Sequence, residues 1–381
     1  MGYNCGVDGR RDRRLIQRAS LAPLFFSIFM ATATVSEARS KPAAGNPIDQ
    51  YVQAEMAREK IPGLALLVMR HGHVTEMRGF GLANVELGVP VTPSTMFQSA
   101  SLAKQFTAMA TLVLAEQGKI SLSDPVSRYF PDAPPTWRDI RVENLLSHTA
   151  GLDDFSEEMD KRKDYSEDDL VRLIEATPLK YAPGQGWRYS NPGYVLLGIL
   201  IHRVTGRSYG DVLHDEVFRP LGMPTARTIS VVDIIPNRAA GYRLDNGRLT
   251  HQKWVSPSLS STADGGLELS LRDFVSWENG LRQRKLISAQ SYARMWTPFL
   301  LKDGQPNVRG YGFGWVIRRV NERALIEHEG RFQGFTTNIS RYTDDDLTIV
   351  ILTNQGAADP GDMTHHIAGL INPKLDEPPR E

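Results

Sequence analysis

Ser101 and Lys104 are the two residues whose types and spacing most directly suggest chemistry. A spacing of three places both side chains on one face of a helix, about one turn apart. A serine hydroxyl is a weak nucleophile until a base removes its proton, and a lysine can be that base when burial and the positive end of a helix disfavour its ammonium form. We therefore expect a helix that begins near Ser101, with free backbone N–H groups directed at a reacting carbonyl.

The Ser-x-x-Lys spacing also suits a serine that only caps a helix, so the catalytic hypothesis depends on other segments. The neighbouring Ser99 has no lysine three or four positions later and is predicted to be a cap or turn residue. A second segment, 184–193, is rich in glycine and proline and is predicted to be a loop that projects Tyr189 and Asn191 into a cleft. Tyr189 can shuttle the serine proton, and Asn191 can hold a substrate amide or the lysine. The alternative is an ordinary loop whose tyrosine packs on the surface.

A third segment, HEGR at 328–331, follows a β-like run. Gly330 would let a substrate backbone lie along the strand edge. The N–H group of Arg331 can form an oxyanion hole together with the N–H group of Ser101. His328 offers a polar group to a substrate carboxylate or a bound water, although a histidine at a strand end can equally be structural.

Periodicity places these segments in a mixed fold of the α/β (α+β) type. The two ends of the chain are predicted to supply a helix at 48–60, strands at 64–69, 74–83, 312–320, 324–328, 336–342 and 347–353, and a helix at 360–371. Between them, residues 101–300 are dominated by helical patterns and loops. We therefore expect one antiparallel sheet built from both chain ends and flanked by helices, with an inserted, mainly helical lobe beside it. Clefts form readily where two such lobes meet.

The composition is that of a soluble globular protein. The 381 residues are 41% hydrophobic and 23% charged, with a formal net charge of zero. The sequence shows no basic stripe with interleaved aromatic residues, so nucleic acid is not an expected partner. The histidines at 71, 73, 365 and 366 lack a third ligand in a suitable pattern, so no metal is expected.

The first forty residues differ from the rest. Arginines between 10 and 18 precede an apolar run at 19–35, which small residues close at 36–38. This order predicts a secretory signal peptide and a periplasmic or secreted protein. The alternative is an uncleaved membrane anchor, although Pro23 and several serines and threonines interrupt a run that would need about 20 apolar residues to span. Cys5 is the single cysteine and precedes the run, so no disulfide or thiolate chemistry is expected.

Taken in order, the three segments resemble the motifs of the serine β-lactamase and penicillin-binding superfamily, particularly class C β-lactamases, D-alanyl-D-alanine carboxypeptidases and related esterases. The family motifs S-x-x-K, Y-x-N and K-T-G or H-x-G correspond to SLAK at 101–104, YSN at 189–191 and HEG at 328–330. The stretches LLSHTAGL at 145–152, GGL at 265–267 and YGFGW at 311–315 also resemble the family. The likeness covers residues 46 to 372.

The resemblance implies a β-lactamase/transpeptidase-like fold and a mechanism through an acyl-enzyme, with no cofactor. The implied roles are attack on a carbonyl by Ser101, proton transfer by Lys104 and Tyr189, oxyanion binding by the N–H groups of Ser101 and Arg331, and substrate binding by Asn191, His328 and Gly330. His148 would support the site rather than react.

One departure from the family narrows the expected function. His328 stands where class C β-lactamases usually carry lysine, which argues against an efficient β-lactamase and leaves carboxypeptidase, esterase and weak β-lactamase activity open. The expected partner is a small-molecule or peptide substrate. The alternative is a non-catalytic penicillin-binding sensor, or a membrane-anchored interaction protein, of the same fold. The oligomeric state stays open.

The predicted organisation follows from these patterns. Its parts are a signal peptide at 1–38, a linker at 39–46, a serine hydrolase domain at 47–372 with a sheet lobe (47–100 and 305–372) and a helical lobe (101–304), and a C-terminal tail at 373–381.

Overall fold

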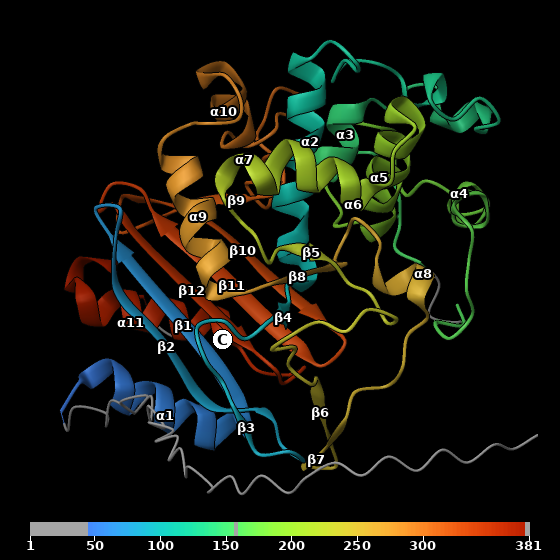
Figure 1. Ribbon diagram of the computed structural model, residues 1–381. Coiled ribbons are helices and arrows are strands. Elements are labelled where there is room, and N and C mark those ends of the chain that lie inside the picture. The colour runs from blue at the N-terminus through green and yellow to red at the C-terminus, as the bar shows by residue number, and fades with distance from the viewer. Residues whose placement is uncertain (1–44, 156–158, 378–381) are drawn as a thin grey trace, which may run out of the picture. The chain divides into compact units, whose positions relative to one another are not determined.

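Seven antiparallel strands from the two ends of the chain form the main sheet, in the order β3-β2-β1-β12-β11-β10-β9 (Figure 1). The computed structural model describes residues 45–155 and 159–377, so the predicted signal peptide, most of the linker and the end of the tail lie outside the described residues. The pairing of β1 with β12 confirms the predicted sheet of both chain ends. The strands are β1 Gly63–Arg70, β2 His73–Asn84, β3 Val89–Pro90, β9 Val316–Val320, β10 Arg323–Phe332, β11 Phe335–Tyr342 and β12 Leu347–Thr353.

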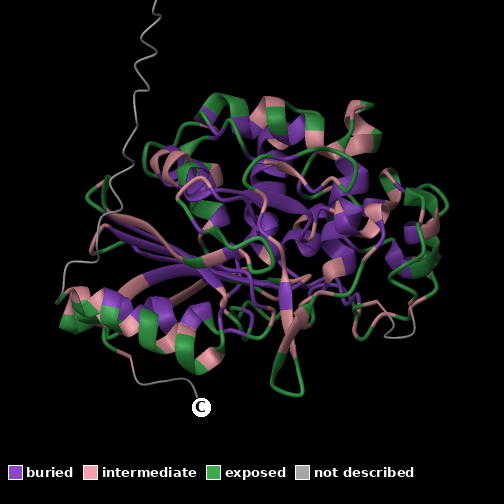
Figure 2. Ribbon diagram, turned by 60° about the horizontal axis from the view of Figure 1, so that its bottom comes forward, coloured by how far each residue is buried: buried purple, intermediate pink, exposed green. Residues whose placement is uncertain are grey.

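Strand β1 shows why the apolar runs of this sheet are continuous rather than alternating. Its side chains point alternately to the two faces, and each face has its own core. Ala65, Leu67 and Met69 belong to the core shared with the middle of the chain, whereas Leu64 and Leu66 belong to a second core on the opposite face. Figure 2 shows the central strands of the sheet as a buried layer between the helices.

Two terminal helices cover one face of the sheet, and α9 (Leu271–Arg282) packs on the other (Figure 1). Helix α1 (Pro47–Glu59) begins after the Asn46 cap and ends at Lys60, whose φ of 56° is left-handed. Helix α11 (Pro360–Ile371) begins after the Asp359 cap and packs on β11 and β12. Both helices agree with the prediction from periodicity.

The middle of the chain contains most of the helices, as predicted, and two small sheets that the periodicity did not indicate. The small sheets are β4-β8-β5 and the hairpin β6-β7. Their strands are β4 Phe97–Gln98, β5 Arg227–Thr228, β6 Tyr242–Asp245, β7 Arg248–His251 and β8 Leu267–Leu269. The remaining helices are α2 Ala103–Glu116, α3 Val142–Leu146, α4 Glu167–Glu175, α5 Asn191–Thr205, α6 Tyr209–Leu213, α7 Arg219–Leu221, α8 Pro257–Ser260 and α10 Ala289–Met295.

A buried ion pair joins α9 to the main sheet. Arg341 on β11 donates from Nε to Glu278 Oε2 at 2.7 Å and from Nη2 to Glu278 Oε1 at 3.2 Å, and both residues are buried. Breaking such a pair by removing one partner leaves an uncompensated buried charge, which costs about 3–5 kcal/mol.

We expect Glu278→Gln to lower the free energy of unfolding by about that amount, measured by urea denaturation. The exposed pair of Arg138 and Asp139 supplies the control, since Asp139→Asn should change stability by less than about 1 kcal/mol. Equal effects of the two substitutions would contradict a stabilising role for the buried pair.

Within 45–155 and 159–377, no helix is both long and apolar enough to cross a bilayer.

Candidate active site

Ser101 lies in a 3₁₀ turn, Ala100–Leu102, between β4 and α2. The sequence predicted an α-helix from about Ser101, but α2 begins two residues later, at Ala103. Ala100 is fully buried with a φ of 49°, a left-handed conformation that costs a non-glycine residue about 1–3 kcal/mol and persists where the surroundings enforce it. The surroundings here hold the preceding residue, because Ser99 N donates to Leu267 O at 2.8 Å and Thr337 Oγ1 donates to Ser99 O at 2.8 Å.

The Lys104 ammonium group is fully buried and meets three acceptors. Its Nζ lies 3.1 Å from Ser101 Oγ, 2.9 Å from Asn191 Oδ1 and 2.6 Å from the backbone oxygen of Asp264. An ammonium has three N–H donors, so each acceptor takes one. The structure therefore brings together Ser101, Lys104 and Asn191 as predicted, and adds a backbone carbonyl that no side-chain motif could have indicated.

Tyr189 and Asn191 reach this cluster from the start of α5. Ser190 caps that helix through Oγ, which accepts from Gly193 N at 3.2 Å. This cap fixes the backbone from which the side chains of the two neighbouring residues project. Lys104 Nζ lies 4.9 Å from the centre of the Tyr189 ring. The tyrosine is thus beside the lysine, and its role in proton transfer stays a prediction.

His148 holds the backbone of this second motif. The imidazole is buried, and its Nδ1 accepts from Ser190 N at 3.2 Å, while its ring centre lies 4.4 Å from that of Tyr189. Burial, and then the positive charge of Lys104, lowers the pKa of His148 well below its usual value. A neutral imidazole at this point supports the loop without repelling the ammonium group, in agreement with its expected supporting role.

His328 is a neutral side chain on the wall of a cavity that Ser101 also lines. Both of its ring nitrogens form hydrogen bonds within the protein. Nδ1 lies 2.6 Å from Glu329 O, which can only accept, so Nδ1 carries the hydrogen. Nε2 therefore accepts from the hydroxyl of Tyr311 at 2.8 Å. Burial, and then the charge of Lys104, lowers the pKa of His328 to about 3. Its predicted contact with substrate would consequently involve no ionic attraction.

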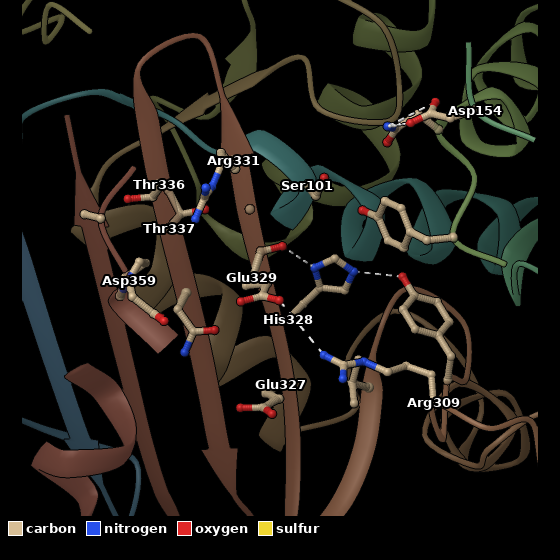
Figure 3. Close-up of a pocket in the computed structure, with 18 of the residues that line it drawn as sticks. Ser101, Asp154, Arg309, Glu327, His328, Glu329, Arg331, Thr336, Thr337 and Asp359 are labelled. Atoms are coloured by element: carbon tan, nitrogen blue, oxygen red, sulfur yellow. Dashed lines mark hydrogen bonds and ion pairs between the residues drawn. The ribbon is translucent and has the colours of Figure 1, made fainter. Parts of the chain in front are cut away.

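Gly330 lies against the backbone of the Ser101 turn. A Cβ atom at 330 would stand 2.7 Å from Ser101 N and 2.8 Å from Ser99 O, closer than Cβ atoms approach backbone atoms. The glycine thus lets β10 approach the turn, and the side chain of the next residue, Arg331, lines the same cavity (Figure 3). Oxyanion binding by the N–H groups of Ser101 and Arg331 remains a prediction.

We expect Gly330→Ala to slow acylation of Ser101 by about 10- to 100-fold, because the added methyl group must displace the backbone that carries the hydroxyl. The measurement is the rate of labelling by a fluorophosphonate, followed by intact mass. Gly265→Ala is the control, since a Cβ there would make an ordinary 3.6 Å contact with Ala100 C. Labelling of both variants at the wild-type rate would contradict this close-packing argument.

A cavity of about 680 Å³ contains this site, and its wall includes charged residues that the sequence motifs did not indicate. Asp154 accepts from Asn191 Nδ2 at 3.1 Å, and Arg309 lies 4.0 Å from Glu329 (Figure 3). Asp154 comes from the loop after α3 and Arg309 from the loop before β9. Neither has a spacing relative to the three motifs that could have revealed it.

Comparisons with known proteins agree with the fold and the motifs. The profile of the Beta-lactamase family matches residues 48–370, so the chain belongs to the Beta-lactamase family and the resemblance is confirmed. Penicillin-binding protein 4* of Bacillus subtilis (strain 168) is 30% identical over 311 residues, which are 76% of this chain and 67% of that protein. The chain spans about two thirds of the length of the curated relatives it matches.

Two solved structures are also similar. The octameric penicillin-binding protein homologue from Pyrococcus abyssi has a TM-score of 0.74 and 28% identity, covering 85% of this chain and 76% of that one. The D-amino acid amidase from Ochrobactrum anthropi SV3, complexed with D-phenylalanine, has a TM-score of 0.71 and 25% identity, covering 82% and 93%. Together with the family match, these likenesses place the chain in the serine β-lactamase and penicillin-binding superfamily.

Proposed function

We propose that this protein forms an acyl-enzyme on Ser101 and hydrolyses a peptide, an amide or an ester. The observation that carries the proposal is the hydrogen-bonded series from Ser101 through the buried Lys104 to Asn191, in which Ser101 and Asn191 line the cavity. In the unprotonated form that a general base requires, Lys104 would keep two N–H donors for Asn191 and the Asp264 carbonyl and would direct its lone pair at Ser101 Oγ. This arrangement supports Lys104 as the base for the serine proton.

The proposed reaction needs only groups of this site. Ser101 Oγ attacks the substrate carbonyl and its proton passes to Lys104, while the N–H groups of Ser101 and Arg331 bind the oxyanion. The carbonyl re-forms as the bond to the leaving group breaks, and Lys104 or Tyr189 returns the proton to that group. Water then attacks the ester on Ser101 by the same steps, which releases the acid and restores the hydroxyl. His328 is neutral and gives a substrate carboxylate no ionic attraction, so Arg309 and Arg331 are the cationic side chains at the wall of this cavity.

The test is to label the wild-type protein with a fluorophosphonate and with benzylpenicillin, and to locate each adduct by peptide mapping. We expect the adducts on the peptide that contains Ser101, together with turnover in a panel of a p-nitrophenyl ester, nitrocefin and a peptide ending in D-Ala-D-Ala. An adduct elsewhere would overturn the nucleophile assignment. A stable adduct on Ser101 without turnover of any substrate would instead support the non-catalytic penicillin-binding sensor.

Export to the periplasm or the exterior is part of the same proposal. It is supported by the order of charged, apolar and small residues in the first 38 positions and by the bacterial origin of the penicillin-binding relative. N-terminal sequencing of the exported protein is decisive. A start after residue 35 supports a cleaved signal peptide, and a retained apolar run supports the membrane anchor.

A further inference from the structure

Asp154 presents a carboxylate to the cavity beside the catalytic cluster. Its two oxygens accept from Asn191 Nδ2 at 3.1 and 3.4 Å, and Oδ1 also accepts from Phe155 N at 2.9 Å. Asn191 in turn accepts from Lys104. Two side chains thus separate the Asp154 carboxylate from Ser101. A substrate whose carbonyl is bound at Ser101 can therefore reach this carboxylate with a group one or two residues away from that carbonyl.

The adjacent Asp153 shows what this loop does with a carboxylate that is structural. Asp153 forms ion pairs with Lys180, at 2.7 Å, and with Arg188. Asp154 forms no ion pair with a lysine, arginine or histidine of residues 45–155 and 159–377, and it is exposed to solvent at the cavity wall. The two neighbours therefore differ: the protein neutralises one carboxylate and leaves the charge of the other available.

Among the described residues, no cationic side chain around this cavity forms an ion pair with that carboxylate. The N–H donors of Lys104 are directed to other acceptors, Arg331 lines the cavity without an ion pair to Asp154, and His328 is neutral. Arg309 is at the opposite wall, 4.0 Å from Glu329 (Figure 3). A substrate group that meets Asp154 therefore meets a negative charge with amide groups around it, which favours a cation that can donate hydrogen bonds.

We infer that Asp154 binds an ammonium group of the substrate, so that the favoured substrates are amides or esters of an aminoacyl or short peptidyl group with a free amine. This inference rests on the proposed function, because it concerns the acyl group that Ser101 would accept. A charge-assisted hydrogen bond of this kind changes affinity by about 10- to 100-fold. The site would thus select substrates by the amine of the acyl group.

The test compares eight p-nitroanilides: alanyl and alanylalanyl, each with a free and with an acetylated amine, and each in both enantiomeric series. For the better free-amine substrate, we expect wild-type kcat/KM to exceed that of its acetylated counterpart by at least about tenfold. In Asp154→Asn the ratio should fall to within about threefold of one. Asparagine at 154 keeps an acceptor for Asn191. Any misplacement of Lys104 would lower kcat/KM for the free-amine and the acetylated substrate alike, and would leave their ratio unchanged.

Asp153→Asn is the matched control and should keep the wild-type ratio, with melting temperatures measured for both variants to confirm folding. The inference is overturned if wild type shows no preference for the free amine, if it hydrolyses none of the anilides, or if Asp154→Asn retains the preference. Failure of the proposed function looks different. It would appear as Ser101→Ala hydrolysing the same substrates as fast as wild type.

Discussion

Ser101→Ala should lower kcat/KM by at least about a thousandfold and abolish labelling by both the fluorophosphonate and the penicillin. Loss of a serine nucleophile removes the covalent step, and the residual rate then depends on the oxyanion-binding groups and substrate positioning alone. The change is also small in structural terms, because the hydroxyl at 101 accepts from Lys104 and makes no other hydrogen bond within residues 45–155 and 159–377. Steady-state turnover and intact mass measure the two effects separately.

Ser99 provides the matched control for this prediction. It lies two residues away, is 1% exposed, and its hydroxyl donates only a 3.3 Å hydrogen bond to Ala100 O among the described contacts. Ser99→Ala should therefore keep labelling and turnover near wild type. A protein that loses its adduct in Ser99→Ala but keeps it in Ser101→Ala would place the nucleophile at 99.

Lys104→Met should reduce the acylation rate by about 10²- to 10⁴-fold, the range for removal of a general base. Methionine fills much of the same buried volume but cannot accept the proton of Ser101, and it leaves the acceptors of Asn191 and Asp264 without their donor. Single-turnover labelling with the fluorophosphonate isolates acylation from the later step.

The control for Lys104→Met is Lys180→Met, which removes a half-exposed lysine that pairs with Asp153 outside the proposed cluster. This variant should label at close to the wild-type rate. If Lys104→Met labelled equally fast at an unchanged melting temperature, another group would have to be the base. If Lys104→Met lost both labelling and stability, comparing its unfolding transition with that of Lys180→Met would show whether the loss of labelling comes from unfolding.

Much of the sheet could be predicted from the sequence because its strands carry long apolar runs with turn residues between them. The turn after β1 is an example: His71 and Gly72 both adopt positive φ, which suits a two-residue hairpin. The two small sheets could not be predicted in this way. β4 and β5 have two residues each, too few to establish a period of two.

The site divides along similar lines. Ser101, Lys104 and Asn191 could be named because their side chains belong to short motifs, and the structure brings all three into contact. The 3₁₀ turn at Ser101 could not be predicted from the sequence, because it depends on hydrogen bonds with the distant residues Leu267 and Thr337 rather than on local propensity. The same is true of the Asp264 carbonyl and of Asp154, whose importance comes only from what the fold places beside them.

The two walls of the proposed site come from distant parts of the chain, and this has a consequence for biosynthesis. Thr337 and the carbonyl of Ser99, which its hydroxyl supports, are 238 residues apart in sequence. A chain made from its N-terminus exposes the serine and lysine long before β10 and β11 exist to pack against them. Contacts between residues so far apart in sequence also form late in folding, because the entropy of closing the intervening loop must be lost before the contact can stabilise the chain. A nascent or truncated chain that carries Ser101 but lacks the C-terminal strands should thus show no acylation of Ser101. The activity should appear in one step when these strands join β1.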